Sequence, residues 1–189
     1  SIKGVDNLIH MIRELQKVDL STRGGGGNTV RNMIAQEDAG VDIDELFDVT
    51  PYVIALTERL IAEKESWTLP RKYKIAFSGS EKDKGYATIN DVGFIAKIKD
   101  GEKGFKVFVA GGMGAKSDTA KILFDFISEN EVLNIAEAIK FVFSKYGNRR
   151  NKHTARLRFL YNKLGKDEFE KKFWEEYNAI KEKKLKPLD

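Results

Sequence analysis

Alternation of apolar and polar residues is clearest over residues 69–77, which read Leu-Pro-Arg-Lys-Tyr-Lys-Ile-Ala-Phe. A period of two predicts a strand that places Tyr73 and Ile75 on one face. Lys72 and Lys74 then share the opposite face. Two ammonium groups on one face are unfavourable unless they reach water or an anion. The stretch therefore predicts either an edge strand protected by lysines or a site for a polyanion.

A helical period of apolar residues recurs along the rest of the chain. It predicts helices over residues 5–18, 50–61, 128–146, 154–164 and 167–180. Strand-like runs at 91–98 and 105–110 flank Asp100-Gly101, which is typical of a hairpin turn. Another short apolar run covers 123–127.

These elements predict an α+β fold with a mixed β-sheet flanked by helices. We expect a single domain over residues 1–189, with an α+β core at 28–146 and a basic loop and C-terminal helices at 147–189. The last helix carries aromatic residues on one face, and this spacing favours a core or interface role over base stacking. They are Phe169, Phe173, Trp174 and Tyr177.

Composition limits the chemistry that this chain can perform. Its 189 residues are 41% hydrophobic and carry a formal net charge of +4, a mild excess that favours anionic partners. The sequence has no cysteine, which excludes disulfides, a thiolate nucleophile and a cysteine-ligated metal or iron–sulfur cluster within these residues. With only His10 and His153, a histidine-rich metal site is not expected either, and we predict no metal ligand.

The sequence shows no sign of a membrane partner. No apolar run is long enough to span a bilayer, and no charged-then-apolar leader precedes a small-residue cleavage site. We therefore expect a cytoplasmic location.

Four consecutive glycines, Gly24 to Gly27, precede Asn28. We predict that Asn28 caps a helix through Ile34 with Arg31 in its first turn, because a glycine loop that leads into a helix start can bring backbone N–H groups close to an anion. A flexible linker before a helix is the alternative. The spacing fits neither a Walker loop nor a dinucleotide-binding pattern.

Two further clusters have both a structural and a ligand-binding interpretation. Gly111 to Gly114 follows the predicted hairpin and suits either a tight turn or close approach to a bulky group. Arg149, Arg150 and Lys152 form a basic loop between two helices, which is either solvated surface or an anion contact.

Five motifs, in this order, resemble the siroheme-dependent nitrite and sulfite reductase family along nearly the whole chain. They are Thr22-Arg-Gly-Gly-Gly-Gly-Asn-Thr-Val-Arg-Asn32, Leu69-Pro-Arg-Lys-Tyr-Lys-Ile-Ala-Phe-Ser-Gly79, Asn90-Asp-Val-Gly-Phe94, Gly111-Gly-Met-Gly114 and Gly147-Asn-Arg149. The chain is similar to the first of the two related siroheme-binding halves in that family.

The resemblance implies a cofactor, a substrate and roles for the cations. In the family, siroheme carries eight carboxylates, its iron binds sulfite or nitrite, and a 4Fe-4S cluster feeds in electrons from a donor such as ferredoxin or a flavoprotein. By motif position, Arg31, Lys72 and Lys74 are expected to surround the iron-bound anion and to act in catalysis. The expected cofactor-binding residues are Asn28, Arg31, Arg71, Lys72, Lys74, Gly111, Gly112, Arg149, Arg150 and Lys152.

The chain departs from the family in lacking the cluster cysteines and the second half that carries them. We expect it to be one domain of a longer reductase, isolated without siroheme and inactive, and able to self-associate through its unfilled cofactor face. The composition of residues 78–85 leaves nitrite versus sulfite open.

Two functions without redox chemistry remain as alternatives. One is a cofactor-free module that binds nucleic acid or another polyanion through the same cations, and the ordered motifs argue against it. The other is an interaction subunit that pairs its open face with another chain or with a second copy.

Overall fold

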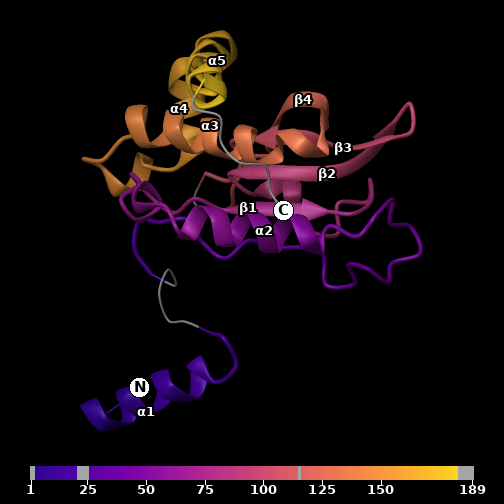
Figure 1. The fold of residues 1–189 in the computed structure, drawn as a ribbon. Coiled ribbons are helices and arrows are strands. Elements are labelled where there is room, and N and C mark those ends of the chain that lie inside the picture. Colours follow the sequence, from indigo (N-terminus) through magenta and orange to yellow (C-terminus); the bar gives the residue numbers. More distant parts are fainter. Residues whose placement is uncertain (1–2, 21–25, 115, 183–189) are drawn as a thin grey trace.

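The computed structural model describes residues 3–20, 26–114 and 116–182. Its centre is a sheet of four strands in the order β1 (Ile75–Ser78), β2 (Val92–Lys99), β3 (Glu102–Val109) and β4 (Lys121–Ser128) (Figure 1). β1 pairs with β2 in parallel, whereas the β2–β3 and β3–β4 pairs are antiparallel. The predicted mixed sheet and its hairpin are therefore confirmed.

The free edge of β1 is covered by the segment 28–34 rather than guarded by lysines. Val30 and Ile34 form parallel bridges to Tyr73 and Ala76. The Arg31 N–H donates to the Tyr73 carbonyl at 2.9 Å. The predicted helix from Asn28 to Ile34 is wrong, because these backbone groups pair with the entry to β1 instead of with one another. Of the glycine run before it, Gly24 and Gly25 lie outside the described residues.

Helices make up most of the remaining regular structure. They are α1 (Val5–Gln16), α2 (Thr50–Ile61), α3 (Val132–Tyr146), α4 (Leu157–Leu164) and α5 (Lys166–Glu182). The five helices predicted from a helical period are all present, although α3 begins at Val132 rather than at residue 128 and α4 begins three residues later than predicted. A short 3-10 helix at Lys152–Thr154 and the extended residue Arg156 precede α4.

Aromatic side chains fasten α2 and α3 to one face of the sheet. Phe77 stacks on Phe94 with 4.7 Å between ring centroids, and Phe105 meets the edge of Tyr52 from α2 at 5.0 Å. The Tyr73 hydroxyl donates to the carbonyl of Ala136 in α3 at 2.9 Å. Residues 73, 75 and 77 are all 0% exposed, so the predicted inward face is confirmed.

The C-terminal helix α5 completes the core beside α3 (Figure 1). Phe169 and Phe173 are 0% exposed. Phe173 also meets Phe124 of β4, with 5.4 Å between the rings. The aromatic face of α5 is thus core, as its spacing predicts, and only Trp174 at its margin remains 45% exposed.

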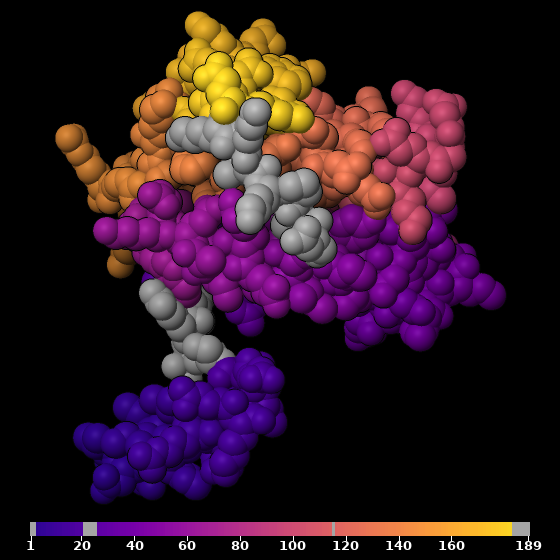
Figure 2. Space-filling view, viewed as in Figure 1, coloured from indigo at the N-terminus to yellow at the C-terminus, as the bar shows by residue number. Residues whose placement is uncertain are grey.

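Helix α1 stands apart from the rest of the molecule (Figures 1 and 2). None of its residues is buried, and the apolar side chains of Leu8 and Ile9 are 41% and 42% exposed. Within the described ranges, no helix combines the length and the apolar character needed to cross a membrane.

Candidate functional site

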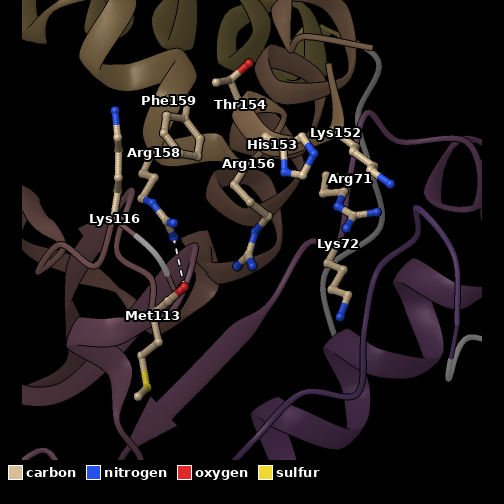
Figure 3. A pocket seen from close by; sticks show the side chains of 10 residues that line it. All are labelled: Arg71, Lys72, Met113, Lys116, Lys152, His153, Thr154, Arg156, Arg158 and Phe159. Carbon is tan, nitrogen blue, oxygen red and sulfur yellow. Dashed lines mark hydrogen bonds between the residues drawn. The ribbon is translucent and has the colours of Figure 1, made fainter. Parts of the chain in front are cut away.

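A pocket of about 500 Å³ opens where the basic motifs meet (Figure 3). Six cationic side chains line it, and no carboxylate is among the described residues of its wall. The lining residues are Arg71, Lys72, Met113, Lys116, Lys152, His153, Thr154, Arg156, Arg158 and Phe159.

The sheet explains why distant segments converge here. β1 and β2 run in parallel from the same end, and Val92 at the start of β2 pairs with Val109 at the end of β3. The entry to β1, which carries Arg71 and Lys72, therefore lies at the same end of the sheet as the glycine cluster 111–114. The segment 152–158 before and at the start of α4 forms the remaining wall.

Lys72 is the centre of a group of like charges. Arg31 has the largest effect in lowering the pKa of the Lys72 ammonium, followed by burial and then by Arg71, Lys74 and Arg156. The three cations expected to act in catalysis, Arg31, Lys72 and Lys74, are thus brought close together. Cations crowded in this way repel one another and attract an anion.

Asp91 lies behind this group and is fully buried. Its Oδ1 accepts from Arg156 Nε at 3.2 Å, and its Oδ2 accepts from Arg156 Nη2 at 2.7 Å and from the Lys74 backbone N–H at 2.9 Å. Burial raises the pKa of the Asp91 carboxyl, while the Arg156 guanidinium opposes that rise. The Asp91 carboxylate thereby connects the strand segment that carries Lys74 to the segment that carries Arg156.

Arg158 is an arginine with few partners. It is 5% exposed, its Nη1 donates to the Met113 carbonyl at 3.2 Å, and its Nε has no hydrogen-bond partner among the described residues. Burial and the nearby Arg156 lower the pKa of its guanidinium. An arginine that lines a cavity and forms no ion pair among the described residues suits an anionic ligand.

The second glycine cluster makes room for protein groups. A Cβ added to Gly112 would lie 2.4 Å from Arg158 Nη1, and one added to Gly111 would lie 2.7 Å from the Asn90 carbonyl oxygen. The close approach suggested by the glycines therefore involves Arg158 and backbone of this chain.

Other predicted site residues lie next to the pocket without lining it. Arg31 Nη2 donates to the Gly27 carbonyl at 3.2 Å. Asn28 Oδ1 accepts a long hydrogen bond of 3.5 Å from Arg71 Nη1. The glycine motif and the basic strand motif, which are about forty residues apart, are therefore side by side.

The basic loop divides into two parts. Arg149 donates to the Thr68 and Ser144 carbonyls at 2.8 Å each, so it ties the loop to the end of α3. Arg150 is exposed, and of the three predicted cations only Lys152 lines the pocket. Contacts of Arg149 and Arg150 with a cofactor stay predictions.

Sequence reasoning missed several residues of the wall, above all Arg158. Arg158 lies in the first turn of α4, where the helix dipole disfavours a cation, so another interaction must hold its side chain. No such signal is present in the sequence, because the helix predicted there begins at residue 154 and places Arg158 beyond its first turn. Lys116, Met113 and Phe159 give no signal either.

The residues present fit a polycarboxylate macrocycle better than an iron–sulfur cluster. The wall that the structure describes contains six lysine and arginine side chains and no carboxylate, and such cations bind carboxylates. For metal binding, the described ranges hold no suitable group of three or more histidine, cysteine, aspartate or glutamate side chains. Because the sequence has no cysteine, thiolate ligands for a cluster would have to come from outside these 189 residues.

Comparison with known proteins gives a consistent result. The family described as "Nitrite and sulphite reductase 4Fe-4S domain" matches residues 26–181. Ferredoxin–nitrite reductase of Leptolyngbya laminosa is 31% identical over 170 residues, which are 87% of this chain and 33% of the relative. Sulfite reductase [ferredoxin] 1 of Mycolicibacterium paratuberculosis is 30% identical over 174 residues, or 92% of this chain and 31% of the relative.

Solved structures agree in fold. The Mycobacterium tuberculosis NirA protein superposes with a TM-score of 0.83 at 32% identity, covering 93% of this chain and 32% of that one. Dissimilatory sulfite reductase I superposes with a TM-score of 0.75 at 14% identity over 93% of this chain and 58% of that one, a likeness of fold alone. The chain spans about a third of the length of the curated relatives that it matches. With its ordered motifs and its mixed sheet, the chain belongs to the nitrite and sulfite reductase family.

Proposed function

We propose that this chain forms the cation-lined part of a siroheme and substrate cavity in a nitrite or sulfite reductase. One observation carries the proposal: six cations from separate segments line one pocket whose described wall contains no carboxylate. Cations left without counterions cost stability unless a polyanion compensates them. A macrocycle with eight carboxylates would supply that compensation.

Arginines suit the macrocycle carboxylates, because a guanidinium can bind a carboxylate through two parallel hydrogen bonds. We assign Arg71 and Arg158 to this role, together with Lys152 as a point charge. Further contacts are proposed for residues next to the pocket and on the basic loop. These are Asn28, Gly111, Gly112, Arg149 and Arg150.

Substrate binding is assigned to Arg31, Lys72 and Lys74. Siroheme, when bound, supplies the iron that binds and reduces sulfite or nitrite. The three cations lower the cost of bringing an oxyanion next to a polycarboxylate group. Because neighbouring cations and burial lower the pKa of Lys72, its ammonium gives up a proton more readily than a free lysine and can donate to a departing oxygen.

Electron supply must involve residues beyond this sequence, because it offers no thiolate for a 4Fe-4S cluster. A ferredoxin is the proposed donor, in line with the names of the relatives. We expect the 189-residue chain by itself to be purified without siroheme and to be inactive. An absorption band of siroheme in the purified chain, together with sulfite or nitrite turnover, would contradict this.

Titration with uroporphyrin III, a stable macrocycle with eight carboxylates, tests the binding role directly. We expect the chain to quench its fluorescence, with affinity that falls as salt rises. Lys152→Gln should weaken binding about tenfold, because one charge-assisted contact with a macrocycle carboxylate is lost. Lys99→Gln is the matched control. It removes the same charge, but Lys99 is exposed at the end of β2 that lies away from the pocket.

Equal losses for the two variants would show that net charge alone drives binding and would refute the pocket. Single-stranded DNA serves as a competitor. If it displaced uroporphyrin III at similar concentrations, the general polyanion-binding function would replace the proposed one.

A further inference from the structure

We propose that Asp91 is a positioning residue, whose buried carboxylate fixes the Arg156 guanidinium beside Lys72 and ties it to the segment that carries Lys74. The proposal rests on the proposed function for the identity of the ligand, but not for the geometry. Asp91 does not line the pocket, so it acts through Arg156 and the backbone.

The contact between Asp91 and Arg156 determines an orientation as well as a charge balance. Both carboxylate oxygens are engaged, by Arg156 Nε at 3.2 Å and Nη2 at 2.7 Å. The Asp91 side chain is 0% exposed and that of Arg156 18% exposed. A planar guanidinium held at two nitrogens has a fixed plane, which leaves its third nitrogen for the pocket that it lines.

Without Asp91, this position would be unfavourable for Arg156. Arg156 lies between Arg158 and Lys72 (Figure 3) and lowers the pKa of both side chains. Repulsion from two cations would drive a flexible arginine towards solvent. The Asp91 carboxylate offsets that repulsion from behind the pocket wall.

Residue 91 also connects other parts of the wall through hydrogen bonds of its side chain and its backbone. Its Oδ2 accepts from the Lys74 N–H at 2.9 Å, and its carbonyl accepts from the Ala110 N–H at 2.8 Å, directly before the glycine cluster. A single buried residue thus joins the basic strand entry, the glycine cluster and α4. Loss of its charge should therefore alter the arrangement of the cations more than their number.

The direct test is exchange of the Arg156 Nε–H proton with water, followed by nitrogen-15 NMR on the 189-residue chain. In the unmodified protein this proton donates to a fully buried carboxylate, so we expect slow exchange. Asp91→Asn should remove the protection, because an amide has a single acceptor oxygen and its NH2 group would face one of the two Arg156 N–H donors. Asp125→Asn is the matched control, since the Asp125 side chain is 79% exposed and lies outside the pocket.

Binding of uroporphyrin III gives the second readout. Asp91→Asn should weaken it about tenfold although the net positive charge increases, and Asp125→Asn should not weaken it. In an Arg156→Gln background, Asp91→Asn should cause little further loss, because its effect passes through Arg156. Arg156→Lys keeps the charge but loses the two-point contact, so it should also bind weakly.

Fast exchange of the Arg156 Nε–H in the unmodified chain would overturn the proposal, even if Asp91→Asn failed to fold. So would tight binding by Arg156→Lys, or equal losses from Asp91→Asn with and without Arg156. If the unmodified chain bound no uroporphyrin III, the proposed function would fail while the exchange measurement still decided the role of Asp91.

Discussion

Two groups of charges in this molecule have opposite arrangements. The pocket at the start of β1 gathers cations whose nearest compensating carboxylate, Asp91, lies behind the wall. On α3, Lys140 is 0% exposed and is surrounded by two carboxylates, those of Glu63 and Glu137. The first group leaves donors available to a ligand, whereas the second pairs its charges with one another beside a cavity of about 340 Å³ that Glu63 and Glu137 line.

The group around Lys140 balances its charges through the lysine and a proton on Glu137. Lys140 donates to Glu63 and to Ser66 Oγ, the latter at 3.3 Å, and lies 3.6 Å from Glu137 Oε1. Burial and the hydrogen bond with Glu63 raise the pKa of the Glu137 carboxyl to about 8. Burial acts in the same direction on Glu63, but hydrogen bonds with Glu137 and Lys140 outweigh it and its pKa is lowered. One proton and Lys140 thus balance the two carboxylates, with a further contribution from Arg59, whose Nε lies 3.7 Å from Glu63 Oε1.

The difference distinguishes binding from structural charges. A buried ion that keeps its partners within the fold contributes to one packed arrangement, and breaking it exposes an unpaired charge. Cations that face a cavity without carboxylates gain their partners only when a ligand arrives. Substitutions in the Lys140 cluster should therefore affect stability, and substitutions of the pocket cations should affect ligand binding.

The largest effect is expected from Lys140→Met. It removes the buried cation from Glu63 and leaves only the more exposed Arg59, 3.7 Å away. Losing one partner of a buried pair costs roughly 3–5 kcal/mol of unfolding free energy. Urea unfolding at pH 7 measures the change. Lys145→Met on the same helix is the control, because the Lys145 side chain is 60% exposed in its pair with Glu176 and should contribute about 1 kcal/mol or less. Similar losses of unfolding free energy in both variants would show that the buried Lys140 contributes no more to stability than an exposed lysine.

The proton held by Glu137 predicts a pH dependence of stability. The Glu137 carboxyl keeps its proton up to about pH 8 in the folded chain and has an ordinary pKa of 4.5. Its contribution is complete below about pH 4.5, falls as pH rises and is lost above about pH 8. Glu137→Gln, which mimics the protonated acid, should flatten the decline in urea midpoint between pH 5.5 and 8.5. An unchanged slope in this variant would contradict a raised pKa at Glu137.

Local sequence patterns predicted most of the regular structure, for identifiable reasons. The period of two from Tyr73 to Phe77 and the period of α3 each place apolar residues on one side, and these sides are buried. The prediction of a helix over 28–34 was wrong because the hydrogen-bond partners of this segment lie about forty residues away, at the entry to β1. A helix cap and an extended edge segment look alike when the distant strand is unknown.

The candidate site was predicted only in part, because it depends on the same distant contacts. Arg71, Lys72 and Lys152 lie together as expected from separate motifs. The role of Asp91 depends on a contact across 65 residues, and the burial of Arg158 depends on Gly112. No local period encodes either contact. The Lys140 cluster was missed for the same reason, since the apolar stripe of α3 gives no indication of a buried ion on that helix.

The smallest effect on stability is expected at Gly112, where the pocket and the backbone meet. In Gly112→Ala, the new Cβ would lie 2.4 Å from Arg158 Nη1, so the end of that side chain must move. Because the guanidinium is the mobile end of a long side chain, the unfolding free energy should fall by only about 1 kcal/mol, near the value of its hydrogen bond to Met113. Binding of uroporphyrin III should fall severalfold, because Arg158 can no longer hold its place in the wall. Gly26→Ala, where an added Cβ meets nothing within 4 Å, should change neither quantity. Loss of stability without loss of binding in Gly112→Ala would make Arg158 a structural charge like Lys140 and erase the distinction between the two groups.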